Sequence, residues 1–456
     1  MPLDLTFRQQ AAMLAANEMT ASALVEAALE RIARRDGALK SIVHLSETAL
    51  AEAERLDLMA PEDRPPFAGL VFGVKDIIDV AGQPTRCGSH AHNEMPAEDA
   101  AVVATLRRTG MIPVAKLATY EYALTGPAYD QPNPPARNPW NTNHITGGSS
   151  SGSAAAVAGG LMRVALGTDT GGSVRAPAAY CGVVGLKPTR GLVPDRGCFP
   201  LSRSLDVVGP IGASVDDVAF VLERLIPGFA PVAPRQDIAG LVIGYARDWF
   251  ADDPHTDAAV LSALDDAAGR LSMLGARINL VDLPDYQPLE DAATVILQAK
   301  ALAVHKEGLG RNYEAYGVDA RRNLLTGALL TDEHVAAAQS VAAGFRLRVD
   351  EALQTCAALL TPTTLGPAPA FTDFRDGPVW TPMRTMPFNM SGHPAISLPC
   401  GLGDTGLPLG AQLVGGFGQE RMLIRIAGAL ELVSLPLICP VPAENNDLSH
   451  REPAEI

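Results

Sequence analysis

Two glycines and a serine, Gly171-Gly172-Ser173, end a segment of the chain whose residue types suit acyl transfer. Glycines let the backbone approach a substrate closely and turn neighbouring N–H groups toward one point, where an oxyanion is stabilised. A helix that begins near Ser173 would add the positive end of its dipole to the same point. The segment therefore predicts a nucleophilic serine beside an oxyanion hole.

A serine nucleophile needs a base at neutral pH, and the usual candidate is histidine. His144 lies in a polar, Asn-rich loop and His393 lies at the start of a predicted strand, so we expect both to be structural. Lysine can serve instead when burial lowers the pKa of its ammonium group. Lys75 follows the apolar run 69–74, although the neighbouring Asp76 shows that the segment is not uniformly apolar. Lys75 is a chemically suitable base, and an ordinary lysine at a strand end is the competing interpretation.

A second Ser/Gly turn, GGSSSG, occupies residues 147–152. It follows residues 126–146, which are rich in Pro and Asn and predict a long loop. Residues 153–166 after it are almost wholly small and apolar, as expected of a helix packed on all sides. The two Ser/Gly turns are therefore expected to bracket one buried helix.

The pattern G-x-S-x-G at residues 148–152 also fits the nucleophile elbow of α/β-hydrolases, with Ser150 at its centre. That elbow requires a buried strand immediately before it, whereas residues 140–146 are polar and no downstream Asp and His form an obvious pair. Short motifs of this kind often match by chance. We therefore reject this interpretation.

The elements that would position these residues follow an α/β pattern. Residues 20–36 place apolar side chains on one stripe, with Thr20 as a candidate N-cap and Gly37 just beyond, which predicts an amphipathic helix. The apolar run 69–74 ends on Lys75 and predicts a short buried strand. Further strands are predicted at 241–246, 395–398 and 410–414, and further helices at 257–274 and 419–432. This mixture indicates an α/β protein built around one large sheet.

Composition excludes several classes of function. Asp and Glu outnumber Lys and Arg by 51 to 36 and are dispersed, so nucleic acid and anionic membranes are poor partners. The six cysteines form no C-x-x-C pair and have no histidine at metal-ligand spacing, so we expect free thiols and no metal. No signal peptide or membrane-spanning segment is predicted, which makes cytoplasmic location the default expectation.

Several motifs in a fixed order resemble the amidase signature family. They cover most of the chain and are, in sequence order, GVKDIIDVAG at 73–82, GGSSSGSAAAVA at 147–158, GTDTGGSVR at 167–175, PAAYCGVVGLKPT at 177–189, DVVGP at 206–210, NMSGHPAIS at 389–397 and GLPLGAQL at 406–413. Residues 230–370 match weakly, and in this family the substrate pockets differ there. The resemblance identifies the chain as a member of this family.

The resemblance implies one large domain, 1–456, with a twisted mixed β-sheet flanked by helices on both faces. Within it we expect a helical N-terminal segment at about 1–60, a catalytic core at about 65–230, a variable substrate-pocket region at about 230–370, a C-terminal return to the core at about 380–440 and a loose tail at 441–456. The family's chemistry needs neither a metal nor an organic cofactor.

The resemblance also assigns roles by position. Ser173 is the acyl nucleophile, Ser149 a bridging serine whose peptide bond with Gly148 is cis, and Lys75 the neutral base. The choice of Ser149 over its serine neighbours follows from the family's 24-residue spacing to the nucleophile. The oxyanion hole falls on the backbone N–H groups of Thr170, Gly171, Gly172 and Ser173.

Substrate contacts are less well defined. Gly148, Arg175 and Tyr122 are the candidates. Arg175 could pair with a substrate carboxylate, but a structural salt bridge is the favoured interpretation because arginine commonly anchors such networks. Aromatic residues in neighbouring segments could line the pocket, yet ordinary packing is expected for most of them.

The expected activity is hydrolysis of a carboxylic amide through an acyl-enzyme, with a small-molecule amide as substrate and a homodimer as a possible assembly. Carbamates, anilides and esters remain alternatives because the same chemistry serves them. The family also includes the glutaminase subunit of tRNA-dependent amidotransferases, which passes ammonia to a partner subunit. A non-catalytic binding protein is disfavoured because all three positions of the triad carry the required residue types.

Overall fold

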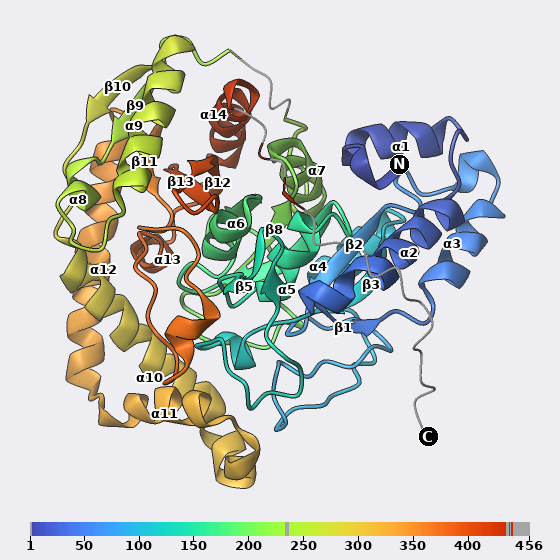
Figure 1. Cartoon of the computed structure of the whole chain (residues 1–456), viewed down its shortest axis with the longest axis horizontal. Helices are drawn as coiled ribbons and strands as arrows, with labels where there is room; N and C mark the ends of the chain where they lie inside the picture. The colour runs from blue at the N-terminus through green and yellow to red at the C-terminus, as the bar shows by residue number, and fades with distance from the viewer. Residues whose placement is uncertain (1, 233–236, 435–436, 438, 441–456) are drawn as a thin grey trace.

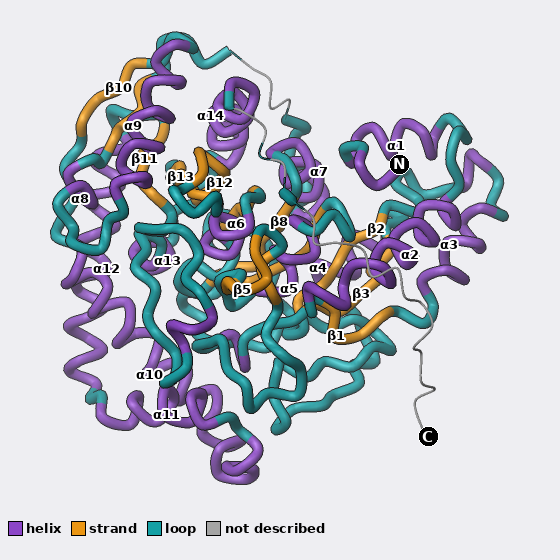
Figure 2. The backbone as a smooth tube through the Cα atoms, viewed as in Figure 1, coloured by secondary structure: helices purple, strands orange, loops and turns teal. Residues whose placement is uncertain are grey.

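One mixed sheet of eleven strands runs through the computed structural model, which describes residues 2–232, 237–434, 437 and 439–440 (Figures 1 and 2). The strand order is β1-β3-β2-β6-β8-β7-β12-β13-β11-β9-β10. The strands are β1 (Ile42–Leu45), β2 (Val71–Lys75), β3 (Ile112–Leu117), β6 (Val164–Asp169), β7 (Val184–Lys187), β8 (Val207–Gly212), β9 (Val242–Tyr245), β10 (Arg277–Leu280), β11 (Ala358–Pro362), β12 (Ala395–Leu402) and β13 (Pro408–Val414). The predicted α/β fold around one large sheet is confirmed.

Strand direction brings the two predicted catalytic segments to one edge. β2 is parallel to β3 on one side and to β6 on the other, so the carboxyl ends of all three strands lie together. Lys75 ends β2, and Asp169 ends β6 just before the Gly171-Gly172-Ser173 turn. In α/β sheets this edge is where ligand sites form.

Helices cover both faces of the sheet. α5 and α6 contact each other and the central strands, while a second row of helices runs from α4 to α7, α14 and α9, each in contact with the next. α10, α11 and α12 make a further group that contacts α13 and stands beside the sheet (gold to orange in Figure 1). The α-helices are α1 (Phe7–Ala15), α2 (Ala21–Leu39), α3 (Ala49–Asp57), α4 (Ala101–Arg108), α5 (Ser151–Ala158), α6 (Arg175–Cys181), α7 (Val215–Leu225), α8 (Asp248–Ala251), α9 (Ala258–Met273), α10 (Tyr286–Asn312), α11 (Val318–Thr326), α12 (Asp332–Leu353), α13 (Met386–Ser391) and α14 (Glu420–Val433). None of the helices within the described ranges combines the length and apolarity needed to cross a bilayer.

Most predicted elements are present. The strands expected at 69–74, 241–246, 395–398 and 410–414 correspond to β2, β9, β12 and β13, and the helices at 257–274 and 419–432 to α9 and α14. Thr20 caps α2 by accepting a hydrogen bond from the N–H of Ala23, as predicted. Gly37 does not end that helix, which continues to Leu39 and closes on Lys40 in the left-handed conformation.

Two predictions along the catalytic core are wrong. Residues 153–166 are not one helix: α5 ends at Ala158, and β6 begins at Val164. Gly160, with φ +70°, allows the turn that separates them. Residues 126–146 are not wholly loop either, because β4 (Arg137–Asn138) and β5 (Asn141–Ile145) pair there as a small ribbon. The tail predicted at 441–456 lies outside the described residues.

Candidate active site

Lys75 is fully buried at the carboxyl end of β2. Its Nζ donates to Ser149 Oγ at 2.8 Å and to Thr168 Oγ1 at 2.8 Å. Burial disfavours the ammonium form and lowers the pKa of Lys75 from 10.5 to about 7, although the carboxylates of Asp169 and Asp206 act in the opposite direction. A substantial fraction of Lys75 is therefore a neutral amine at neutral pH, as a general base must be.

The three consecutive serines have different partners. The peptide bond between Gly148 and Ser149 is cis, in agreement with the resemblance. Only the first serine of the three bonds with Lys75. Ser150 Oγ accepts from the N–H of Thr168 at 3.3 Å and lies 3.2 Å from its carbonyl oxygen, and Ser151 Oγ donates to the carbonyl of Ala118 at 3.2 Å. Ser150 and Ser151 thus attach the turn to β6 and to the end of β3. Ser149 is the serine of the three that can exchange a proton with Lys75.

The turn after β6 is organised by the buried carboxylate of Asp169. Its Oδ1 accepts from the N–H of Gly172 at 2.8 Å, and its Oδ2 accepts from the N–H of Val174 at 3.1 Å. Gly172 has φ +134°, and a Cβ there would collide with the side chain of Thr385, so only glycine fits. Because its N–H faces Asp169, Gly172 is not a free oxyanion donor in this structure, which leaves the N–H groups of Thr170, Gly171 and Ser173 from the expected set.

Arg175 is a structural residue. It is fully buried at the first position of α6, and its guanidinium forms an ion pair with Asp169 at 2.8 Å. The remaining donors reach the carbonyl of Thr385 at 3.0 Å, Gln412 Oε1 at 2.6 Å and Asn389 Oδ1 at 2.5 Å. Burial would raise the pKa of Asp169, but the adjacent guanidinium holds it well below its ordinary value. The proposed contact between Arg175 and a substrate carboxylate is therefore wrong, and the structural salt bridge is present.

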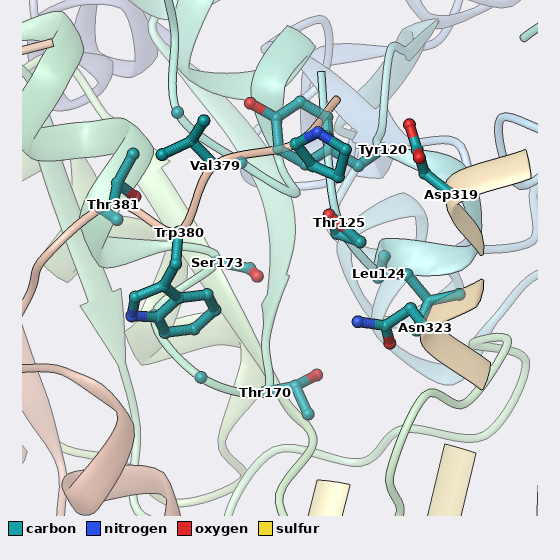
Figure 3. Close-up of a pocket in the computed structure, with 18 of the residues that line it drawn as sticks. Tyr120, Leu124, Thr125, Thr170, Ser173, Asp319, Asn323, Val379, Trp380 and Thr381 are labelled. Atoms are coloured by element: carbon teal, nitrogen blue, oxygen red, sulfur yellow. The ribbon is translucent and has the colours of Figure 1, made fainter. Parts of the chain in front are cut away.

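Ser173 is partly exposed just before α6 and lines a cavity of about 560 Å³. Gly148 and residues 170–172 line the same cavity. In Figure 3 the Ser173 hydroxyl points into the space between Trp380 on one side and Leu124 on the other. Among the described residues no hydrogen bond joins the Ser173 hydroxyl to Ser149. The structure therefore contains the Lys75–Ser149 contact and places Ser173 at the cavity.

Tyr122 does not line this cavity. Its backbone has φ +50°, which turns the side chain into a buried aromatic cluster where it stacks on Tyr316 with ring centroids 5.1 Å apart and contacts His305 at 4.5 Å. The expectation of a substrate contact at Tyr122 is wrong. The neighbouring Tyr120 lines the cavity instead, with its ring packed against Gly148.

The two histidines considered as bases are structural, as predicted. His144 Nδ1 lies 2.8 Å from the carbonyl of Ala368. His393 lies between Ser391, at 3.0 Å, and Asp350, at 3.0 Å, which is a Ser–His–Asp arrangement by residue type. Ser391 is fully buried and does not line the cavity, so this group cannot act on a substrate.

Thr168 and Asp169 are site residues to which sequence reasoning gave no role. Thr168 supplies the second hydroxyl that binds Lys75, and Asp169 shapes the turn that carries Ser173. Both lie in the GTDTGGS motif, which was the available signal. Asn389 and Gln412, which bind Arg175, also lie inside motifs of the family resemblance.

Comparison with known proteins gives consistent results across the chain. The family model described as Amidase matches residues 23–424. The A subunit of the glutamyl-tRNA(Gln) amidotransferase of Exiguobacterium sibiricum is 35% identical over 91% of this chain and 95% of its own length.

Solved structures agree with that result. The crystal structure of a protein named amidase has a TM-score of 0.86 and 31% identity, covering 94% of this chain and 100% of that chain. The native peptide amidase from Stenotrophomonas maltophilia has a TM-score of 0.80 and 29% identity, covering 94% of this chain and 97% of that one.

Proposed function

Because the chain belongs to the amidase family, we propose that it hydrolyses a carboxylic amide through an ester formed on Ser173. It is an enzyme that acts on amide C–N bonds. The observation that carries the proposed mechanism is the buried contact of 2.8 Å between Lys75 Nζ and Ser149 Oγ, beside a cavity lined by Ser173. A lysine that bonds with hydroxyl groups and has a pKa of about 7 is suited to accept a proton from a hydroxyl.

In the first half of the reaction, Lys75 takes a proton from Ser149, Ser149 takes one from Ser173, and Ser173 Oγ attacks the amide carbon. The N–H groups of Thr170, Gly171 and Ser173 stabilise the negative oxygen that forms. The C–N bond then breaks, and the leaving nitrogen receives a proton back through Ser149 from Lys75. The products of this half are the acyl ester on Ser173 and a free amine or ammonia.

In the second half, water attacks the ester carbon and gives its proton to Ser149, which passes its own proton to Lys75. The C–O bond to Ser173 breaks, the serine regains its proton, and the carboxylic acid leaves. Contacts between catalytic hydroxyls are often long in the absence of substrate and shorten when it binds. The missing contact between Ser149 and Ser173 is compatible with this sequence of steps.

A second candidate function is the glutaminase subunit of a tRNA-dependent amidotransferase. The observation that favours it is the 35% identity with the amidotransferase relative, which extends over 91% of this chain. Glutamine would then be the amide, and a partner protein would receive the ammonia. Carbamates, anilides and esters are further substrates compatible with the same relay.

Labelling with a fluorophosphonate probe and a panel of amides, anilides, carbamates, esters and glutamine tests these proposals on the purified chain. We expect wild-type protein to be labelled at Ser173 and to hydrolyse simple amides without a partner, and Ser173→Ala to lose labelling and turnover by a factor of about 10⁴ or more. Full activity of Ser173→Ala would refute the mechanism. Activity on glutamine alone, increased by a partner protein, would favour the second candidate.

A further inference from the structure

One part of the wall of the cavity that Ser173 lines is apolar, beside polar side chains such as Thr170 and Tyr120. Met386, Leu201 and Ala176 lie on this wall, and Met383 completes it. All four are buried, and Met386 packs directly over Gly171 in the turn that precedes Ser173. A substrate group placed against this wall loses water without gaining a hydrogen bond, which favours hydrocarbon over polar groups.

Three charged residues, Asp319, Arg322 and Asp376, are among the described residues that line the cavity. Asp319 and Arg322 come from α11, and Asp376 comes from the loop that follows η6 (Phe371–Phe374). Arg322 is the one basic lining residue in that set; 76% of its side chain is exposed, and it faces Asp319 at 3.9 Å. Burial raises the pKa of Asp319, as does the nearby Asp130. An anionic substrate group would therefore meet carboxylates and find no buried cation.

Trp380 forms one side of the cavity on the loop between η6 and α13. Its indole N–H donates to Glu290 Oε1 of α10 at 2.8 Å, which fixes the ring relative to the helix. The residue remains 56% exposed, and Figure 3 shows its ring beside the Ser173 hydroxyl with Leu124 on the opposite side. Exposed aromatic rings of this kind gain contact area when an apolar ligand covers them.

From these observations we propose that the cavity selects neutral amides with a bulky apolar acyl group, aromatic groups included, and that Trp380 is a specificity-determining residue. This inference rests on the proposed function. It names the substrate class of the Ser173 site, and it disfavours glutamine as the preferred substrate because the α-carboxylate of glutamine would meet Asp319 and Asp376 and find no buried cation among the described lining residues.

The size of the effect follows from burial. Each methylene transferred from water to an apolar wall strengthens binding about fourfold. If the acyl chain lies along this wall, kcat/KM rises roughly 200-fold from acetamide to hexanamide. The cavity volume of about 560 Å³ accommodates a ligand of this size. Glutamine should lie at least about 100-fold below phenylacetamide.

The experiment measures kcat/KM for acetamide, butyramide, hexanamide, phenylacetamide and glutamine in the wild-type enzyme and three variants. Trp380→Ala should lower the value for phenylacetamide about tenfold and change that for acetamide less than twofold. Trp380→Phe keeps a ring but loses the bond to Glu290, and should retain most of the preference. Tyr129→Ala is the matched control, since Tyr129 is 62% exposed and does not line the cavity.

The inference is supported if kcat/KM of the wild-type enzyme rises along the acyl series. The rise should be reduced in Trp380→Ala and unchanged in Tyr129→Ala. The inference is overturned if kcat/KM does not rise with the length of the acyl group, or if glutamine is the best of the five substrates. Failure of the proposed function is distinguishable, because then no amide is hydrolysed and the fluorophosphonate probe does not label Ser173 in any of these proteins.

Discussion

Replacing Lys75 by Met links the catalytic proposal to a measurable change in stability. Burial lowers the pKa of Lys75 to about 7 from 10.5, so between these pH values the unfolded chain holds a proton that the folded protein has released. Stability rises with pH wherever the unfolded state binds more protons. Wild-type protein should therefore gain stability across this window, and the Lys75→Met variant should lack that contribution.

The magnitude follows from the same two pKa values. Integrating the linkage relation from pH 7 to pH 9 gives about 2 kcal/mol of additional stability for the wild-type protein. A chain of 456 residues has an unfolding entropy near 1 kcal/mol/K, so this corresponds to about 2 °C in Tm. Relative to wild type, the Tm of Lys75→Met should therefore be about 2 °C lower at pH 9 than at pH 7. This change with pH is expected whether the variant is more or less stable than wild type at pH 7.

Calorimetry at pH 7 and pH 9 and kcat/KM between pH 6 and 9 are the assays. Wild-type kcat/KM should rise with pH through about 7 as the amine becomes neutral. In Lys75→Met, kcat/KM should be lower by a factor of about 10²–10⁴. Lys187→Met is the control, because Lys187 is equally buried with a pKa of about 7 but bonds with the carbonyls of His393 and Pro188. Between pH 7 and pH 9 the Tm of Lys187→Met should fall relative to wild type by the same amount as that of Lys75→Met. The activity of Lys187→Met should still rise with pH.

Two outcomes would refute this reasoning. A Tm difference between Lys75→Met and wild type that does not change with pH would mean that the buried amine is not neutralised near pH 7. A flat pH profile of wild-type activity, or substantial turnover by Lys75→Met, would mean that Lys75 is not the base.

Two further predictions concern neighbouring residues. Ser149→Ala should lower kcat by a factor of about 10²–10⁴, whereas Ser150→Ala should retain chemistry. Each variant removes a buried hydrogen bond and should lose about 1–3 kcal/mol of stability by calorimetry, so activity and not stability separates them. Equal activity losses in the two variants would contradict the assignment. Asp169→Asn leaves the Arg175 guanidinium buried without its counter-charge, so the variant should lose about 3–5 kcal/mol of folding stability. Its Tm should be lower by about 3–5 °C, and a Tm unchanged within 1 °C would contradict this prediction.

The sequence predicted elements well where periodicity was distinctive and failed where it was not. The stripe of α2 and the apolar run of β2 have clear patterns, and both elements are present. Residues 153–166 are small and apolar throughout, and such a run has the same appearance in a buried helix and in a buried strand. The pair Gly159-Gly160 was the signal for the break between α5 and β6.

Site residues were predictable where a motif assigns them, and their neighbours were not. The partners of Arg175 at Thr385, Asn389 and Gln412 lie more than 200 positions away along the chain, and no local spacing encodes them. The direction of the Gly172 N–H depends on a φ of +134°, which residue types alone do not give. The sequence therefore indicated the chemistry of the turn but not which of its N–H groups remain available.

The neutral form of Lys75 depends on where the neighbouring carboxylates are bound. Asp76 is adjacent in the chain, and Asp169 and Asp206 are near enough to oppose the fall in the pKa of Lys75. Each has another partner: Asp76 pairs with Lys116 at 3.0 Å, Asp169 with Arg175 at 2.8 Å, and Asp206 accepts from the Thr170 hydroxyl at 2.7 Å. Within the described part of the chain, Lys75 hydrogen-bonds with two hydroxyl groups instead. A carboxylate in direct contact would stabilise the ammonium form and remove the base, so the proposed chemistry depends on the other contacts of these carboxylates as well as on burial.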